Sequence, residues 1–290
     1  MKVSKQILNV KGSKVKNYFL KSAMVLLIIC GVLSCSAEDK SSASTKELVA
    51  ETPVDGINKF QAYTEKYTEN TVLTQNHATG HIGDLFFTHW KDGGTTSLSM
   101  QMDGNFNVSW QGGGYNYVGG PGWHFGDINR VIGYNFSADS GANFITVYGW
   151  GYDKNMSVTN PAHLVEYYIL QRWSDAYEPS QNGLFGKTFI SNGVEYSTYR
   201  TLREEKPSIN NTSTFYQYWS KPNQPLSLGE NREIIFADHV KAWADSGWTL
   251  PDMNNFDASD DPTYQVIAVE VFNPPKDGTA SGRVWDATPH

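Results

Sequence analysis

The sequence predicts an all-β fold, a sandwich or jelly roll with one helix, and three observations support this class. Aromatic residues make up 13% of the 290 residues, and charged residues only 18%, against roughly 25% in an average protein. From about residue 71, short aromatic runs alternate with turns rich in Gly, Asn, Asp and Pro, as in sandwiches and barrels. This composition also suits a surface that stacks sugar rings on aromatic side chains, although a Tyr- and Trp-rich core would produce it too.

Most of the expected strands are short aromatic or β-branched runs that end at turn residues. They cover residues 84–90, 97–102, 105–111, 115–118, 144–150, 193–203 and 213–220. The last two flank a polar hairpin at 204–212. One helix is expected at 236–246, because Phe236, Val240 and Trp243 recur at helical spacing and Gly247 supplies a stop. His239 on this helix is expected to pack or to face solvent.

Two further expected strands, 163–173 and 264–272, each carry one glutamate on an aromatic or small-residue face. Period-two alternation places Glu166 beside Tyr168 and Glu270 on the face of Tyr264. The opposite faces are Val165, Tyr167 and Ile169 in the first run and Ile267, Val269 and Val271 in the second. A carboxylate in such a face costs desolvation energy unless it is paired or used. The pattern suggests the two carboxylates of a glycosidase; alternatively, each glutamate is a solvated residue on a half-exposed strand.

Residues 1–34 resemble a bacterial lipoprotein signal peptide. A Lys-rich start precedes an apolar run at 22–34, shorter than the about 20 residues that a membrane-spanning helix needs. The run ends in Val-Leu-Ser-Cys, so we expect cleavage before Cys35, lipid attachment there and export to the cell envelope or surface. Residues 35–70 would hold the anchor, a polar flexible linker and a lead-in. The alternative is an ordinary secretory signal in which Cys35 is coincidental.

Charge and motifs argue against several classes of function. The net charge is −7, and residues 1–34 hold Lys but no acid, so the remainder lacks the basic footprint that nucleic acid requires. No HExxH, CxxC, P-loop or GxGxxG motif occurs, and we expect no metal and no cofactor. The acidic stretch 251–262 is expected to be a solvated loop, because its oxygens lack the spacing of a calcium site. We expect a monomer.

The exported part is similar to endo-β-1,4-xylanases of glycoside hydrolase family 11. The resemblance runs from about residue 71 to residue 288, and we expect residues 71–290 to form the catalytic domain. It rests on motifs in the family's order. They are THWKDGG at 88–94, VGGPGW at 118–123, ITVYGW at 145–150, LVEYYI at 164–169, KPSI and TFYQYWS between 206 and 220, HVKAW at 239–243 and YQVIAVE at 264–270.

The resemblance implies a β-jelly roll of two packed, twisted antiparallel sheets shaped like a partly closed right hand. The helix would lie against the back, and the cleft would cross the inner sheet. The implied reaction is retaining hydrolysis of internal β-1,4-xylosidic bonds in xylan, with Glu166 as nucleophile and Glu270 as general acid/base about 5–5.5 Å apart. Mutual repulsion and burial would raise the pKa of Glu270 above that of Glu166.

The resemblance also implies substrate-binding residues that line the cleft or close over it. Trp90 would stack on a xylose ring, and Arg203 and Gln217 would bind sugar hydroxyls. The implied cleft residues are Trp90, Tyr148, Trp150, Tyr168, Arg203, Gln217 and Tyr264. A thumb hairpin that closes over the sugar chain would contribute Pro207, Ser208 and Ile209.

Asn116 falls where the family has a hydrogen-bond partner of the acid/base, and Asn there implies a near-neutral pH optimum. The chain also departs from the family pattern. Phe272 lacks a usual aromatic hydroxyl, Lys221 and Pro222 replace a frequent Val-Arg, and residues 151–162 would be an inserted loop near the cleft. Two other functions remain open: a non-catalytic xylan-binding lectin on the same sandwich, and a related jelly-roll glucanase acting on cellulose.

Overall fold

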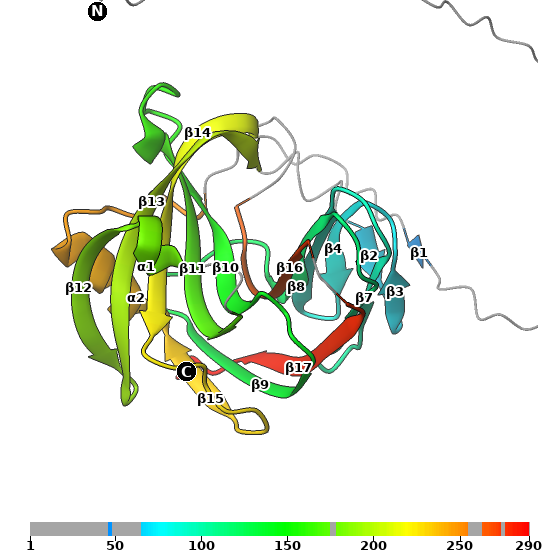
Figure 1. Cartoon of the computed structure of the whole chain (residues 1–290). Helices are drawn as coiled ribbons and strands as arrows, with labels where there is room; N and C mark the ends of the chain where they lie inside the picture. The colour runs from blue at the N-terminus through cyan, green and yellow to red at the C-terminus, as the bar shows by residue number, and fades with distance from the viewer. Residues whose placement is uncertain (1–45, 48–64, 175–177, 255–262, 274–275, 290) are drawn as a thin grey trace, which may run out of the picture. The chain divides into compact units, whose positions relative to one another are not determined.

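The computed structural model of the protein consists mainly of two packed β-sheets (Figure 1). This confirms the expected all-β class. The structure describes residues 46–47, 65–174, 178–254, 263–273 and 276–289, all within one unit that spans residues 43–290. The larger sheet has eleven strands and the smaller sheet six among these residues. Two of the strands, β1 and β2, lie before residue 71, the expected start of the domain.

The larger sheet carries both glutamate strands in its middle. Its order is β1 (Lys46–Glu47), β2 (Glu65–Tyr67), β4 (His77–Ile82), β5 (Leu85–Lys91), β8 (Asn116–Trp123), β16 (Gln265–Phe272), β10 (Phe144–Tyr152), β11 (Leu164–Trp173), β14 (Asn211–Pro222), β13 (Val194–Ser208) and β12 (Leu184–Ser191). The smaller sheet has the order β15 (Arg232–Ile235), β9 (Val131–Asp139), β17 (Gly278–Asp286), β7 (Asn105–Trp110), β6 (Thr96–Met100) and β3 (Thr71–Leu73).

Alternation along β11 and β16 divides the larger sheet into two faces, as the sequence predicts. Val165, Tyr167 and Ile169 of β11 belong to the buried cluster that also contains the inward side chains of the smaller sheet. Tyr168 and Leu170 belong to a second cluster, which lies on the opposite face of the larger sheet. One face of each central strand therefore packs in the core between the sheets, and the other is left for a site.

The helix α2 (Phe236–Asp245) lies where the sequence predicts it and packs on the core. Phe236 and Trp243 are fully buried, and the Phe236 ring lies 5.2 Å from that of Tyr167. Gly247 ends the helix region with φ of +80°, a conformation that glycine adopts without strain. His239 is 1% exposed, so of the two positions expected, packing and facing solvent, it has the packing one. A one-turn helix, α1 (Pro179–Asn182), precedes β12.

Two strand pairs are parallel, and in this the sheets differ from the wholly antiparallel arrangement expected. They are β2 with β4 and β11 with β14. After β11 the chain reaches the sheet edge as β12 and returns through β13, so β14 enters beside β11 in the same direction. This pairing depends on a long connection that no local pattern specifies. Its register sets Glu166 directly opposite Gln217.

The expected thumb is the end of the β13–β14 hairpin, whose strands extend further than predicted. Ile209 and Asn210 form the connecting turn. The Ser208 hydroxyl donates to the Asn211 carbonyl at 2.8 Å and accepts from the Asn210 amide at 3.0 Å. These bonds fix the geometry of the turn through the side chain of one serine.

The expected insert at 151–162 is irregular only from Asp153, because β10 continues through Tyr152. The Asp153 amide donates to the His163 carbonyl at 2.8 Å, which closes the loop at its base. A 3-10 helix (Pro161–His163), capped by the Asn160 side chain, leads the chain into β11. This helix contacts β14, and Figure 1 shows the loop beside the β13–β14 hairpin.

Several predictions fall outside the described residues. They are the signal peptide at 1–34, the anchor at Cys35, the part of the linker and lead-in outside residues 46–47 and 65–70, and most of the acidic loop, of which residues 255–262 are not described. Within the described ranges, no helix is long and apolar enough to cross a bilayer.

The close packing behind the site can be tested by substituting Gly149 on β10. A Cβ there would overlap the Tyr264 carbonyl oxygen, and also the Tyr167 hydroxyl oxygen behind the sheet. We expect Gly149→Ala to lower the free energy of unfolding by about 1–3 kcal/mol or more, because backbone must move to admit the methyl group. Urea denaturation measures this. Gly114→Ala is the control, since its nearest neighbour would be Asn273 Oδ1 at 3.9 Å; equal losses in both variants would contradict the packing argument.

Candidate active site

Glu166 is buried on the outer face of β11 and is held by three side-chain donors. Tyr148 and Tyr168 donate their hydroxyls to Oε1 at 2.7 and 3.0 Å, and Gln217 Nε2 donates to Oε2 at 2.6 Å. Glu166 is only 7% exposed. A buried carboxylate is tolerated when its oxygens accept such bonds. The structure thus excludes the interpretation of Glu166 as a solvated surface residue.

A further chain of hydrogen bonds orients Gln217. Trp219 Nε1 donates to the Thr201 hydroxyl at 2.9 Å, and that hydroxyl donates to Gln217 Oε1 at 2.9 Å. Because the amide oxygen is thereby engaged, Nε2 is the end that faces Glu166. The ring of Trp219 also stacks on Tyr168, with centroids 4.0 Å apart and planes at 13°. Two of the three donors to Glu166 are therefore fixed by the same tryptophan.

Glu270 on β16 has a different environment. It is half-buried, and its Oε2 is shielded from solvent with no hydrogen-bond partner among the described residues. Its neighbours across the sheet are Val118 on β8 and Phe144 on β10, both apolar. A carboxyl in such surroundings favours its neutral, protonated form.

The two carboxyls differ in pKa for these reasons. Burial raises the pKa of Glu166 above its ordinary value, but the bonds from Gln217, Tyr148 and Tyr168 act in the opposite direction. Burial, and then the charge of Glu166, raise the pKa of Glu270 to about 8, with Arg203 and a hydrogen bond from Tyr168 acting against them. Since Glu166 has three donors and the Glu270 Oε2 none, Glu270 holds its proton to the higher pH.

All the cleft and thumb residues expected from the sequence line one cavity of about 360 Å³ that contains both carboxyls. They are Trp90, Asn116, Tyr148, Trp150, Glu166, Tyr168, Arg203, Pro207, Ser208, Ile209, Gln217, Tyr264 and Glu270. Trp150 Nε1 lies 3.3 Å from the Tyr264 hydroxyl, to which it donates. Aromatic walls with a few convergent polar groups are typical of a small-molecule or sugar site.

The hairpin closes one side of this cavity. The register of β13 and β14 shifts between Arg203 and Lys206, where Glu205 has φ of +53°. Such a bulge bends the hairpin and changes the direction of its side chains. Arg203, on the near side of the bulge, lines the cavity, and its buried Nε has no hydrogen-bond partner among the described residues.

The hydrogen bond expected between Asn116 and Glu270 is not formed. Asn116 Nδ2 donates to Asp92 Oδ2 at 2.7 Å, and the Asn116 amide donates to Asp92 Oδ1 at 2.6 Å. Asp92 lies in the turn after β5, the strand that pairs with β8, so the pairing of these strands brings it to Asn116.

Several lining residues were not predicted, although period-two alternation from the predicted residues leads to most of them. Thr88 precedes Trp90 by two, and Phe215 and Trp219 flank Gln217 by two. The complete set is His77, Thr88, Val118, Phe144, Lys206, Phe215 and Trp219. Phe272, noted for its missing hydroxyl, packs on Phe144 at 5.5 Å, so this part of the wall is apolar.

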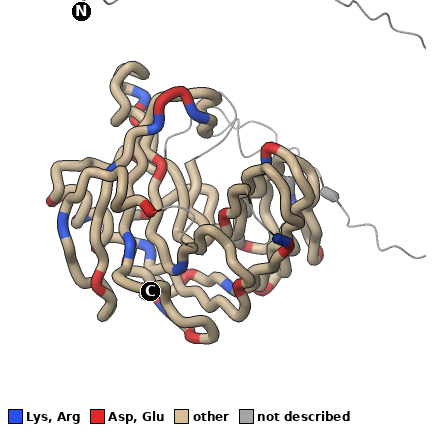
Figure 2. Tube along the Cα trace, viewed as in Figure 1, with Lys and Arg blue, Asp and Glu red and all other residues tan. Residues whose placement is uncertain are grey.

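Charges elsewhere on the molecule are mixed. Figure 2 shows basic residues scattered among acidic ones over the described strands in this view. In the part of the chain that the structure covers, no group of three or more His, Cys, Asp or Glu side chains is placed to hold a metal ion.

A jelly roll with two carboxyls of unequal pKa in one aromatic cleft has the arrangement of a glycoside hydrolase. Residues 83–282 match the model of glycosyl hydrolases family 11. The chain belongs to this family.

Relatives and a solved structure agree with this assignment. "Endo-1,4-beta-xylanase 3" of Pyricularia oryzae is 34% identical over 207 residues, covering 70% of this chain and 78% of that protein. A "bifunctional xylanase/xylan deacetylase" of Cellvibrio japonicus is 33% identical over 209 residues, but the match spans only 29% of its length. A solved endo-1,4-β-xylanase of Trichoderma reesei has a TM-score of 0.55 and 31% identity, covering 71% of this chain and 98% of that one.

The raised pKa of Glu270 predicts a pH-dependent gain in stability for Glu270→Gln. Below about pH 4 the carboxyl is protonated in the folded and unfolded states, so the two proteins should be equally stable. As the pH rises toward about 8, only the unfolded wild type ionises freely. The variant should become more stable than the wild type by up to about 1–3 kcal/mol.

Urea unfolding at pH 4, 6 and 8 measures this difference. Glu195→Gln, an exposed site on β13, is the matched control and should show no comparable trend. A stability difference for Glu270→Gln that does not change with pH would refute the raised pKa.

Proposed function

We propose that the protein is an endo-1,4-β-xylanase that hydrolyses internal bonds of xylan by retaining double displacement. The observation that supports this most is the contrast between two carboxyls in one aromatic cavity. Glu166 accepts three hydrogen bonds, whereas Glu270 lies beside apolar side chains and has a pKa of about 8. A nucleophile must be ionised and a general acid protonated at the same pH, and this contrast provides both.

The substrate class follows from the family and from the walls of the cavity. The Pyricularia and Trichoderma relatives are endo-1,4-β-xylanases. Trp90 and Trp150 supply aromatic surface for sugar rings, and the apolar wall of Phe144 and Phe272 contributes no hydroxyl. Xylose lacks an exocyclic hydroxymethyl group, so a narrow cleft under a hairpin accommodates its chain. Arg203 and Gln217 bind hydroxyls, and the partners are xylan and xylo-oligosaccharides.

In the first step, Glu166 attacks the anomeric carbon while Glu270 donates its proton to the departing glycosidic oxygen. The bond from carbon to that oxygen breaks as an ester bond to Glu166 forms. Tyr148, Tyr168 and Gln217 hold the Glu166 carboxylate in the position from which it attacks. The hairpin residues Pro207, Ser208 and Ile209 close over the sugar and limit the entry of water.

In the second step, Glu270 takes a proton from water, which attacks the anomeric carbon. Once Glu166 is esterified its charge is gone, so the repulsion that raised the pKa of Glu270 is removed and Glu270 can ionise. The ester bond then breaks, Glu166 leaves as a carboxylate, and Glu270 is reprotonated. Two inversions at the same carbon retain its configuration.

Activity of Glu166→Gln tests the proposal. We expect reducing-sugar release from xylan, and none from carboxymethylcellulose, by the wild type. The variant should lose at least about 10³-fold in rate, because its amide cannot form the ester. Glu195→Gln, remote from the cavity, should retain wild-type activity.

Two outcomes would overturn this assignment. Hydrolysis of carboxymethylcellulose in preference to xylan would indicate a glucanase. Retardation of the wild type on a xylan gel without any hydrolysis would indicate a lectin. For Glu270, an unchanged rate of xylan hydrolysis in Glu270→Gln would rule out its role as the acid/base.

We also propose that the chain is exported and lipid-anchored through Cys35 after removal of residues 1–34. The apolar run and the Val-Leu-Ser-Cys sequence support this. In a bacterial host fed labelled palmitate, the full chain should incorporate label and sediment with membranes. Cys35→Ser should do neither. A mature N-terminus at any residue other than Cys35, found by mass spectrometry, would contradict the anchor.

A further inference from the structure

The bulge in the β13–β14 hairpin decides which charged residue faces the cleft. Arg203 on β13 lies opposite Phe215 on β14, and both residues line the cavity. In an uninterrupted strand, Glu205 would share the face of Arg203 and lie opposite Ser213. The register shift sets Lys206 opposite Ser213 instead. One extra residue in β13 thus places a lysine on the cleft face where regular alternation would place a glutamate.

The charges of the hairpin agree with this register. Arg203 and Lys206 line the cavity, whereas Glu204 and Glu205 do not, and both glutamates are exposed. Figure 2 shows basic, then acidic, then basic residues in succession along the hairpin. Glu205 has φ of +53°, which is unfavourable for a residue with a side chain, and its amide donates to the Thr214 hydroxyl at 3.2 Å. The chain therefore adopts a strained backbone where it presents two cations to the cleft.

The two cations differ in their partners. Arg203 acts against the rise in the pKa of both Glu166 and Glu270, so its charge is directed at the two carboxyls. Lys206 is exposed and forms no ion pair within the described part of the chain. With Glu270 protonated and His77 neutral, the cavity holds two cations and one anion, in a chain whose net charge is −7. Lys206 therefore gives the cleft a positive charge that no carboxylate of the described residues balances.

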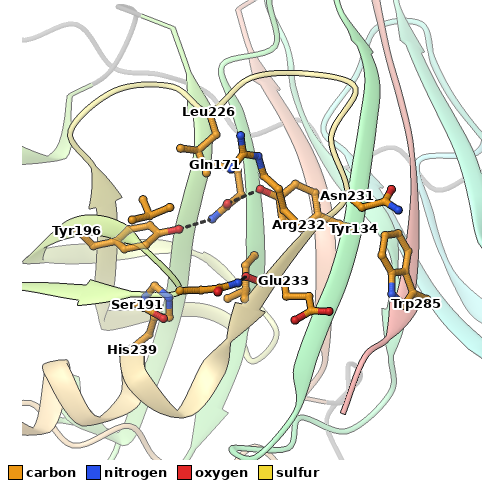
Figure 3. Close-up of a pocket in the computed structure, with 13 residues that line it drawn as sticks. Tyr134, Gln171, Ser191, Tyr196, Leu226, Asn231, Arg232, Glu233, His239 and Trp285 are labelled. Atoms are coloured by element: carbon orange, nitrogen blue, oxygen red, sulfur yellow. Dashed lines mark hydrogen bonds between the residues drawn. The ribbon is translucent and has the colours of Figure 1, made fainter. Parts of the chain in front are cut away.

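Arg232 on β15 lines another cavity and shows the contrasting case. Figure 3 shows it on the other face of the larger sheet, in the same cavity as Gln171 of β11. Arg232 Nη2 pairs with Glu230 Oε2 at 2.5 Å. The charge of Arg232 is thus balanced within the chain, whereas that of Lys206 is available to a bound molecule.

We propose that Lys206 binds the carboxylate of a uronic acid substituent on the xylan chain. This rests on the proposed xylanase function and names the decoration that the same cleft recognises. A substituent on a xylose hydroxyl leaves a narrow cleft at its rim. Lys206 is exposed there, next to the cavity-lining residues Pro207 and Ser208. The uronic acid is ionised at neutral pH, and the flexible stem of lysine lets the ammonium group follow a substituent that the cleft walls do not hold.

The interior of the cavity is unsuited to this carboxylate. There it would meet the ionised Glu166 and the aromatic walls, both of which disfavour a second negative charge. At the rim the charge stays partly hydrated while it pairs with Lys206. An exposed ion pair of this kind has a modest effect, about two- to fivefold in an equilibrium or rate constant, and it is screened by salt.

Two forms of one polymer test this inference. Glucuronoxylan is compared with the same polymer after its carboxyl groups have been reduced to alcohols, which removes the charge and keeps the position of each substituent. The measured quantity is the ratio of kcat/KM on the acidic form to kcat/KM on the reduced form. We expect this ratio to be about two- to fivefold lower in Lys206→Gln than in the wild type, and lower still in Lys206→Glu. The difference should vanish in about 1 M NaCl, where the Debye length is about 3 Å.

Lys241→Gln is the matched control. It removes the same charge from an exposed position on α2, which packs behind the larger sheet and away from the cavity. This variant should keep the wild-type ratio, so that the effect of one local charge is separated from that of the net charge.

The outcomes distinguish this inference from the proposed function. Equal ratios in the wild type, Lys206→Gln and Lys206→Glu, or equal falls in Lys206→Gln and Lys241→Gln, would overturn the inference and leave the xylanase function in place. Hydrolysis of neither polymer by the wild type would overturn the proposed function, and the inference with it.

Discussion

The buried carboxyl of Glu166 is the group on which the rest of the site depends. Burying a charge in an aromatic sheet face is unfavourable unless donors surround it. Its three donors come from three adjacent strands: Tyr148 on β10, Tyr168 on β11 and Gln217 on β14. Only one register of these strands brings all three hydroxyl and amide groups within reach. The burial of this carboxyl therefore requires the observed pairing of the central strands.

Glu270 lies on the same sheet, but its environment is the opposite of that of Glu166. Glu270 lies opposite Val118 and Phe144 in the sheet, and its Oε2 has no donor among the residues that the structure describes. Two identical residues in one cavity thus acquire unequal pKa values, because Glu166 accepts three hydrogen bonds whereas Glu270 lies beside apolar side chains and the charge of Glu166. Replacing the Glu270 surroundings with donors would remove this difference without changing the fold. The chemistry resides in the neighbours of the two glutamates as much as in the glutamates themselves.

Local alternation was enough to predict the faces of β11 and β16, and helical spacing was enough to predict the helix α2, whereas the cleft residues were implied by the resemblance to the family. Local alternation could not predict the parallel pairing of β11 with β14, since that pairing follows from a long excursion through β12 and β13. Nor could it predict that Asp92 takes the Asn116 amide, because the two meet only through the pairing of β5 and β8. His239 was expected to pack or to face solvent, and it packs. Its ring nitrogens have no hydrogen-bond partner among the described residues, and its position beside Tyr196 depends on contacts between α2 and β13, which no run of sequence displays.

Trapping the covalent intermediate tests the central claim most directly. In a 2-deoxy-2-fluoro-xylobioside the fluorine slows both steps, but a good leaving group keeps the first step fast. The second step is then the slower one, so the ester on the enzyme accumulates. Digestion followed by mass spectrometry then identifies the modified residue. The account predicts one adduct, on the peptide that contains Glu166. An adduct on Glu270, or complete hydrolysis of the reagent with inverted configuration and no adduct, would contradict it.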